Sequence, residues 1–181
     1  MNPSTLARVR RVVTENGPNG NSRIQSDGPS PATKTLAERP GFRSDNVWRT
    51  VSGPTLVTAT DTILEHTGVM PPQGGTVLRV IDFPPRPTDP EERRRQASAS
   101  LRALFPDAQH EATHAKPGMH LTQTIDYAIV LQGTITAVLD EDETDLNAGD
   151  ILIQRATNHA WENRTENTTR VAFVLVDGYT S

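Results

Sequence analysis

The sequence contains no cysteine. A disulfide framework, a thiolate metal site and a thiol nucleophile are therefore excluded. Aromatic residues make up only 4% of the 181 residues, so a ligand pocket must be lined mainly by aliphatic and polar side chains. Basic residues are not in excess either, because 18 Lys and Arg stand against 22 Asp and Glu and give a net charge of −4. This balance does not suggest a nucleic-acid surface, and we expect no nucleic-acid partner.

Long apolar runs are also missing. No stretch approaches the length of a membrane-spanning helix, and the first residues contain no apolar signal region. We therefore expect a soluble cytoplasmic protein without a membrane partner. The length favours one structural domain, with residues 1–75 forming an N-terminal hairpin and flanking strands and residues 76–181 forming a barrel.

Residues 118–177 consist of short runs in which apolar and polar residues alternate, interrupted by Gly, Asn and Asp. This alternation is typical of half-buried antiparallel strands. It predicts strands at 127–131, 134–139, 144–146, 151–154 and 171–176. Strands this short and this closely spaced favour an all-β barrel or double-sheet roll.

The first half of the chain predicts fewer elements. Residues 8–14 and 22–26 flank an Asn-Gly turn and predict a hairpin, while residues 27–40 are interpreted as a Pro-rich connector. Strands are predicted at 41–50 and 76–83, with weaker strand character at 54–60. The hairpin is either an edge of the same domain or a strand that pairs with a partner subunit. It and the strand at 76–83 are candidate edges for a homodimer.

One helix is predicted over residues 90–105. Asp89 can cap it, Pro90 suits the first helical position, and Glu91 and Glu92 favour the positive end of the helix dipole. Pro106 ends it.

Two polar clusters lie on the predicted barrel. The first is His120-Leu121-Thr122, followed by Asp126 and, seven residues later, Gly133; the second is Gly149, followed by His159 and, four residues later, Asn163. In these spacings the chain resembles the cupin superfamily, specifically its small single-domain members. The resemblance implies a cupin jelly-roll barrel, a double-stranded β-helix, and small members of this kind commonly form dimers.

The resemblance also implies a metal site, with departures. Metal-binding cupins use two His of an HxH motif, a Glu and a later His; here these positions hold His120, Thr122, Asp126 and His159. At most three ligands remain, namely His120, Asp126 and His159. Two His and one carboxylate can bind a divalent ion such as Zn, Fe, Mn or Ni and leave positions open, and a metal-free pocket is the alternative. His110 and His114 lie in the preceding loop, and either could replace the lost ligand.

His120, Asp126 and His159 are therefore the candidate catalytic residues, as ligands or as acid and base. Thr122, Trp161 and Asn163 are candidate pocket-lining residues; Trp161 shares a strand face with His159, and Asn163 could equally be a turn residue. Tyr127 and Trp48 are predicted to be core residues, and His66 a surface residue.

The function implied is that of a small-molecule enzyme of cupin type. Metal-assisted lyase or isomerase chemistry (decarboxylation, dehydration or isomerisation) on an oxygenated organic acid or polyketide-like substrate would suit this site. Two alternatives stay open: a barrel that binds a small ligand without turnover, and a non-haem iron dioxygenase.

Overall fold

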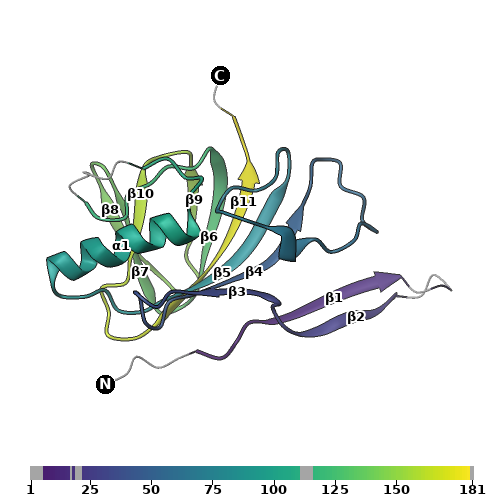
Figure 1. Cartoon of the computed structure of the whole chain (residues 1–181), viewed down its shortest axis with the longest axis horizontal. Helices are drawn as coiled ribbons and strands as arrows, with labels where there is room; N and C mark the ends of the chain where they lie inside the picture. Colours follow the sequence, from purple (N-terminus) through teal and green to yellow (C-terminus); the bar gives the residue numbers. More distant parts are fainter. Residues whose placement is uncertain (1–5, 17, 19–21, 111–115, 180–181) are drawn as a thin grey trace.

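The computed structural model describes residues 6–16, 18, 22–110 and 116–179. Two antiparallel sheets face each other in a barrel, and one helix lies beside it (Figure 1). The larger sheet has the strand order β3 (Ala32–Thr35), β4 (Arg43–Thr50), β5 (Thr76–Phe83), β11 (Thr169–Asp177), β6 (Thr124–Gln132) and β9 (Ile151–Arg155). The smaller has the order β10 (His159–Glu162), β7 (Thr134–Leu139) and β8 (Glu143–Asn147). The predicted all-β, double-stranded β-helix class is confirmed.

The hairpin is formed by β1 (Arg10–Asn16) and β2 (Ser22–Pro29), which pair only with each other among the described residues. It extends away from the barrel (Figure 1). Arg11 ties its base to the larger sheet, because its Nε donates to the Val47 carbonyl at 2.8 Å and its guanidinium pairs with Asp61.

Strand β6 shows why the barrel sequence alternates. Thr124, Asp126 and Ala128 are buried, whereas Ile125 and Tyr127 are exposed. Side chains on a strand point alternately to its two faces, so the even-numbered residues here face the interior. Tyr127, predicted to be a core residue, is 44% exposed, and that prediction is wrong.

The structure differs from the sequence expectations in two other segments. Residues 27–40, interpreted as a connector, contain the end of β2 and the edge strand β3. Residues 54–60 form no strand, and Leu56 and Val57 are exposed. β3 lacks the apolar alternation that identifies a strand, but it forms one because it pairs with β4. Residues 54–60 have side chains that favour strands, but they have no strand to pair with among the described residues.

Strand β5 lies between β4 and β11 and pairs with both, so it offers no free edge to a partner subunit. The prediction that it supplies a dimer edge is therefore wrong. Because β5 is a central strand, most of its side chains are buried inside the protein.

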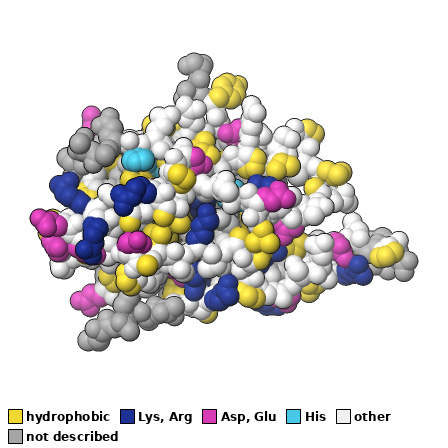
Figure 2. Space-filling model, in the orientation of Figure 1, with side chains coloured by type: hydrophobic (Ala, Val, Ile, Leu, Met, Phe, Trp, Pro, Cys, Tyr) yellow, Lys and Arg dark blue, Asp and Glu magenta, His cyan; other side chains and the backbone are white. Residues whose placement is uncertain are grey.

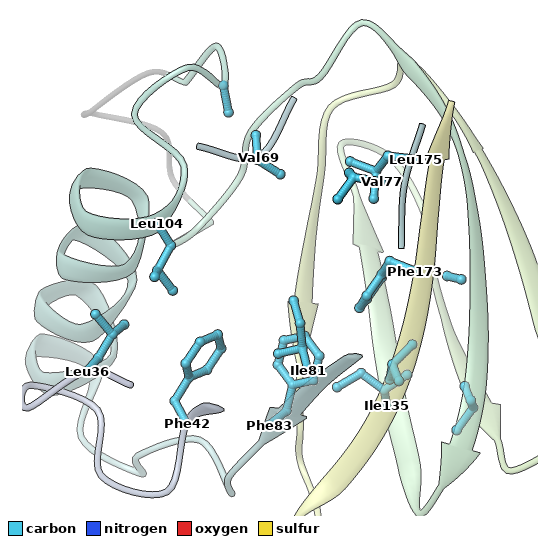
Figure 3. Close-up of a cluster of buried hydrophobic side chains, with 14 residues drawn as sticks. Leu36, Phe42, Val69, Val77, Ile81, Phe83, Leu104, Ile135, Phe173 and Leu175 are labelled. Carbon is cyan, nitrogen blue, oxygen red and sulfur yellow. The ribbon is translucent and has the colours of Figure 1, made fainter. Parts of the chain in front are cut away.

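The helix α1 (Pro90–Leu104) confirms the predicted helix. The Asp89 carboxylate accepts hydrogen bonds from the backbone N–H groups of Glu91 and Glu92, as an N-cap does. Leu104 packs into the core cluster with Leu36 and Phe42, and this cluster continues through Phe83 into the barrel (Figure 3). No helix of the described residues is long and apolar enough to cross a membrane.

Candidate functional site

A cavity lies inside the barrel where the two sheets and the end of α1 meet. Its volume, including its opening, is about 410 Å³. It is lined by Val69, Arg79, Ile81, Phe83, Phe105, His120, Thr122, Asp126, His159, Trp161, Phe173 and Leu175. An apolar wall with a few polar groups is the usual composition of a small-molecule site.

His120 and His159 face each other across paired backbones. The N–H of each donates to the carbonyl of the other at 2.9 Å, and the two imidazole rings are 4.4 Å apart between centroids. His120 also stacks on Phe105 at 5.4 Å. From His120, which pairs with His159 of β10, the chain crosses through the buried Thr122 into β6, and this crossing brings Asp126 to the same cavity as His120.

The backbone fixes the proton position of both imidazoles. His120 Nδ1 lies 2.9 Å from the Gly118 carbonyl, and His159 Nδ1 lies 2.9 Å from the Thr157 carbonyl. A carbonyl oxygen only accepts, so each Nδ1 carries the hydrogen and each Nε2 keeps a lone pair. Burial lowers the pKa of His159 to about 3 and also lowers the pKa of His120. Both rings are therefore neutral at neutral pH.

Asp126 is the carboxylate of this cavity. It is 5% exposed, and its Oδ1 has no hydrogen-bond partner among the described residues. Burial raises its pKa to about 6, while the Thr124 hydroxyl and the positive charge of Arg79 act in the opposite direction. A carboxylate with this pKa is ionised at neutral pH yet basic enough to accept a proton.

Arg79 is a site residue that the sequence reasoning missed. It is 3% exposed on β5, its Nη2 lies 2.8 Å from the Val69 carbonyl and 3.2 Å from His66 Nε2, and its Nε–H has no partner among the described residues. Within that part of the chain it forms no ion pair, and burial lowers its pKa to about 10. The sequence did indicate that Arg79 is buried. Arg79 is two positions from both Val77 and Ile81, so on a strand its side chain shares their inward face.

His66 supports Arg79 and is buried, so its predicted surface position is wrong. Burial lowers its pKa to about 4, and the charge of Arg79 acts in the same direction. His66 is therefore a neutral hydrogen-bond partner that helps to hold a cation inside the barrel.

Only two of the three residues predicted to line the pocket do so. Thr122 and Trp161 line the cavity. Asn163 does not; it is fully buried in the turn after β10, and its amide donates to the carbonyls of Phe83 at 2.8 Å and Asn167 at 2.7 Å. Trp48, predicted to be a core residue, is half-buried beneath the guanidinium of Arg11.

The metal prediction is only partly matched by the geometry. The free Nε2 lone pairs of His120 and His159 are suitable metal ligands, because hydrogen bonds at Nδ1 orient ligand imidazoles in this way. However, no group of three or more His, Asp or Glu within the described ranges is arranged to hold an ion. His110 is exposed and lines a neighbouring pocket with Met119, and His114 lies outside the described residues. The described residues thus supply a pair of ligands rather than the predicted set of three, and the metal remains a prediction.

Comparisons with known proteins agree with this architecture. Residues 109–176 match the cupin domain family. This match spans strands β6 to β11 and agrees with the double-stranded β-helix topology of the barrel.

Several fungal proteins are similar to this chain. Phomopsin biosynthesis cluster protein D of Diaporthe leptostromiformis is 33% identical over 124 residues, which are 67% of this chain and 50% of that protein. A cupin-domain-containing oxidoreductase of Aspergillus ruber is 28% identical over 179 residues, which are 95% of this chain and 74% of that protein. The chain spans about half the length, or less, of the two Diaporthe relatives that it matches.

Proposed function

We propose that this protein is a small-molecule enzyme that moves a proton on an oxygenated substrate inside the barrel. Asp126 is the base, and the reaction belongs to the lyase or isomerase type. The carrying observation is that one apolar cavity is lined both by a buried carboxylate, Asp126, whose Oδ1 has no hydrogen-bond partner, and by a buried guanidinium, Arg79, whose Nε–H has none among the described residues.

Each group has a defined part in this chemistry. Asp126 accepts the proton from a carbon next to a carbonyl, because its raised pKa reduces the mismatch with such a weak acid. Negative charge then develops on the carbonyl oxygen, and the Arg79 Nε–H is available to stabilise it. The apolar walls formed by Phe83, Trp161 and Phe173 keep water from competing.

A second candidate is a metal-dependent oxidation, and two observations favour it. His120 and His159 both line the cavity and keep a lone pair on Nε2, and the Aspergillus ruber relative is named an oxidoreductase. A divalent ion held by these two imidazoles would supply Lewis-acid or redox chemistry. Since the described residues offer no third ligand in place, we assign no step to it.

Deuterium exchange tests the first candidate without knowledge of the natural substrate. Aryl ketones and cyclic diketones are incubated with the protein in D₂O, and deuterium at the carbon next to the carbonyl is measured by mass spectrometry. The wild type should accelerate exchange for part of the panel, and Asp126→Asn should remove the acceleration. Glu141→Gln, on the exposed β7–β8 turn, is the control and should behave as wild type.

If wild type and Asp126→Asn exchange deuterium at equal rates, the proposal is contradicted. The remaining possibilities are then a ligand-binding barrel and a metal-dependent enzyme. Metal analysis of protein purified without chelator separates those two. A stoichiometric ion that is retained by wild type and lost from His159→Ala would support the metal-dependent candidate.

A further inference from the structure

A groove leads from the cavity to the surface between α1 and the barrel. Phe83, Phe105, His120 and Trp161 line both the groove and the cavity, so the two spaces adjoin. The remaining groove residues are Arg39, Phe42, Arg86, Pro87, Arg93, Gln96, Ala97, Ser100, Leu101, Pro117, Gly118, Ala160 and Glu162. A molecule that occupies the groove can therefore extend one end toward Asp126.

Arg39 lies over the aromatic wall of this groove. Its guanidinium carbon is 4.7 Å from the centroid of the Phe42 ring and 5.8 Å from that of Phe83. The turn that carries it is fixed by backbone hydrogen bonds from Arg39 N to the Leu36 carbonyl and from Phe42 N to the Arg39 carbonyl. Figure 3 shows Phe42 between α1 and Phe83, and the centroids of the two rings are 5.9 Å apart, so the position of the cation is set by packed rings.

Arg39 has no acidic partner in the described part of the chain. Three other arginines are paired: Arg43 and Arg170 with Asp82, and Arg86 with Glu162. Desolvation alone accounts for the lowered pKa of Arg39, about 10, and at this value the group is still charged at neutral pH. A partly desolvated cation without an anion is costly unless a ligand supplies the counter-charge.

The charge around the groove has the same sign. Arg39, Arg86 and Arg93 line it, whereas its one acidic lining residue, Glu162, is already bound by Arg86 and Arg164. Figure 2 shows several Lys and Arg side chains over α1 on the viewed face, with Asp and Glu side chains beside them. This arrangement attracts an anion to the groove although the whole chain is acidic.

We propose that Arg39 is the binding site for the acidic group of the substrate, which is therefore an amphipathic carboxylic acid. The carboxylate lies on the guanidinium of Arg39 at the groove, and the apolar body runs along Phe83 and Trp161 into the cavity. This inference rests on the proposed function for the role of the cavity, but it concerns binding rather than turnover.

Equilibrium binding tests it. The probes are ω-phenylalkanoic acids of increasing chain length and the corresponding primary amides, which differ only in charge at the end group. Binding is measured by isothermal titration calorimetry at neutral pH. A charge-assisted pair with Arg39 should make the best acid bind about 10- to 100-fold more tightly than its amide.

Arg39→Gln should remove this preference and leave the amide affinity unchanged. Arg39→Lys should restore part of it, because the charge returns without the bidentate geometry. Arg93→Gln is the matched control: it lines the same groove on α1, and it should keep most of the preference. The thermal midpoint of each variant shows whether the fold is retained.

Three results would overturn the proposal: equal affinity of acids and amides for wild type, no measurable binding of any acid, or an unchanged preference in a folded Arg39→Gln protein. Asp126→Asn separates this inference from the proposed function. It should keep the preference for acids while it loses deuterium exchange, so either claim can fail without the other.

Discussion

Asp126 stands out among the residues of the barrel because its burial favours the protonated carboxyl group in the folded state relative to the unfolded chain. Its folded pKa of about 6 lies above the ordinary value of 3.8, so between these two values the folded protein binds the proton more tightly than the unfolded chain. The sign of the linkage follows: this group lowers the free energy of unfolding as the pH rises from about 4 to about 6.

Replacement by Asn should therefore stabilise the protein above pH 6. The gain should approach zero below pH 4 and reach at most about 3 kcal/mol at neutral pH, as a shift of about two pKa units implies. Urea unfolding of wild type and Asp126→Asn across this range measures the difference. A gain that is constant with pH would show that it does not come from ionisation.

At the scale of single elements, the turn after β10 depends on Asn163. Its amide nitrogen donates to two carbonyls, and its Oδ1 accepts from the backbone N–H of Thr165 at 2.9 Å and from the hydroxyl of the same residue at 2.7 Å. Asn163→Ala leaves the buried Phe83 carbonyl without this partner and removes three partly buried bonds, so it should cost about 2 to 4 kcal/mol of stability. Asn158→Ala, which removes one exposed bond to Asp140, should cost far less.

Chemical denaturation measures both Asn variants. Binding of the phenylalkanoic acids by folded Asn163→Ala provides a second readout and should match that of wild type. A large loss of affinity in a stable protein would mean that Asn163 acts on the site after all.

The turn between β6 and β7 requires Gly133 for two separable reasons. Its φ is +80°, and a Cβ added there would lie 2.6 Å from the Thr169 Oγ1 and 3.2 Å from the Thr169 Cα. Gly149 also has a positive φ, of +97°, but nothing lies within 4 Å of the position of its Cβ. Gly149→Ala should thus cost about 1 kcal/mol of stability, because only the backbone conformation is strained. Gly133→Ala should cost clearly more, because the added Cβ also meets Thr169. Thermal or urea unfolding measures both losses. Equal losses of stability in the two variants would show that Thr169 moves away from the added Cβ at no cost.

The elements of the barrel were predictable from sequence where burial on one face produces alternation, as in β6 and in much of β11. Asp89 and Pro90 likewise marked the start of α1, because capping depends on local sequence. β3 and the crossing through Thr122 were not predictable in this way. Their conformations depend on pairing with β4 and β10, which are distant in sequence.

Some residues of the candidate site could be predicted from the sequence, and others could not. Motif spacing located His120, Asp126 and His159, and strand parity located Trp161. Arg79 was missed because its importance depends on sharing a cavity with Asp126, and the sequence does not show that the two residues meet. Asn163 fitted the motif spacing but serves a turn.

At the scale of the whole molecule, the homodimer remains a prediction, and the structure directs it to a different surface. Exposed apolar side chains gather on the outer face of β6 and the edge strand β9, namely Ile125, Tyr127, Leu131, Ile151 and Ile153. A contiguous patch of this kind on a sheet edge suits a symmetric contact with a second copy.

The double variant Tyr127→Glu/Ile153→Glu should convert the dimer to a monomer in light scattering at micromolar concentration. Ile24→Asp, at an exposed position of the hairpin, should leave the dimer intact. The reverse pattern would assign the contact to β1 and β2, and a monomeric wild type would rule out the dimer.

The central claim is that the barrel cavity holds a proton-accepting carboxylate, and titration of Asp126 tests it most directly. Carbon-13 NMR of side-chain carboxyl groups, with Asp126 assigned by comparison with Asp126→Asn, gives the pKa without any substrate. We predict a value of about 6, and a higher value in a folded Arg79→Met protein, because the positive charge of Arg79 lowers it. A pKa at or below the ordinary 3.8, or one that does not respond to the loss of Arg79, would contradict the account.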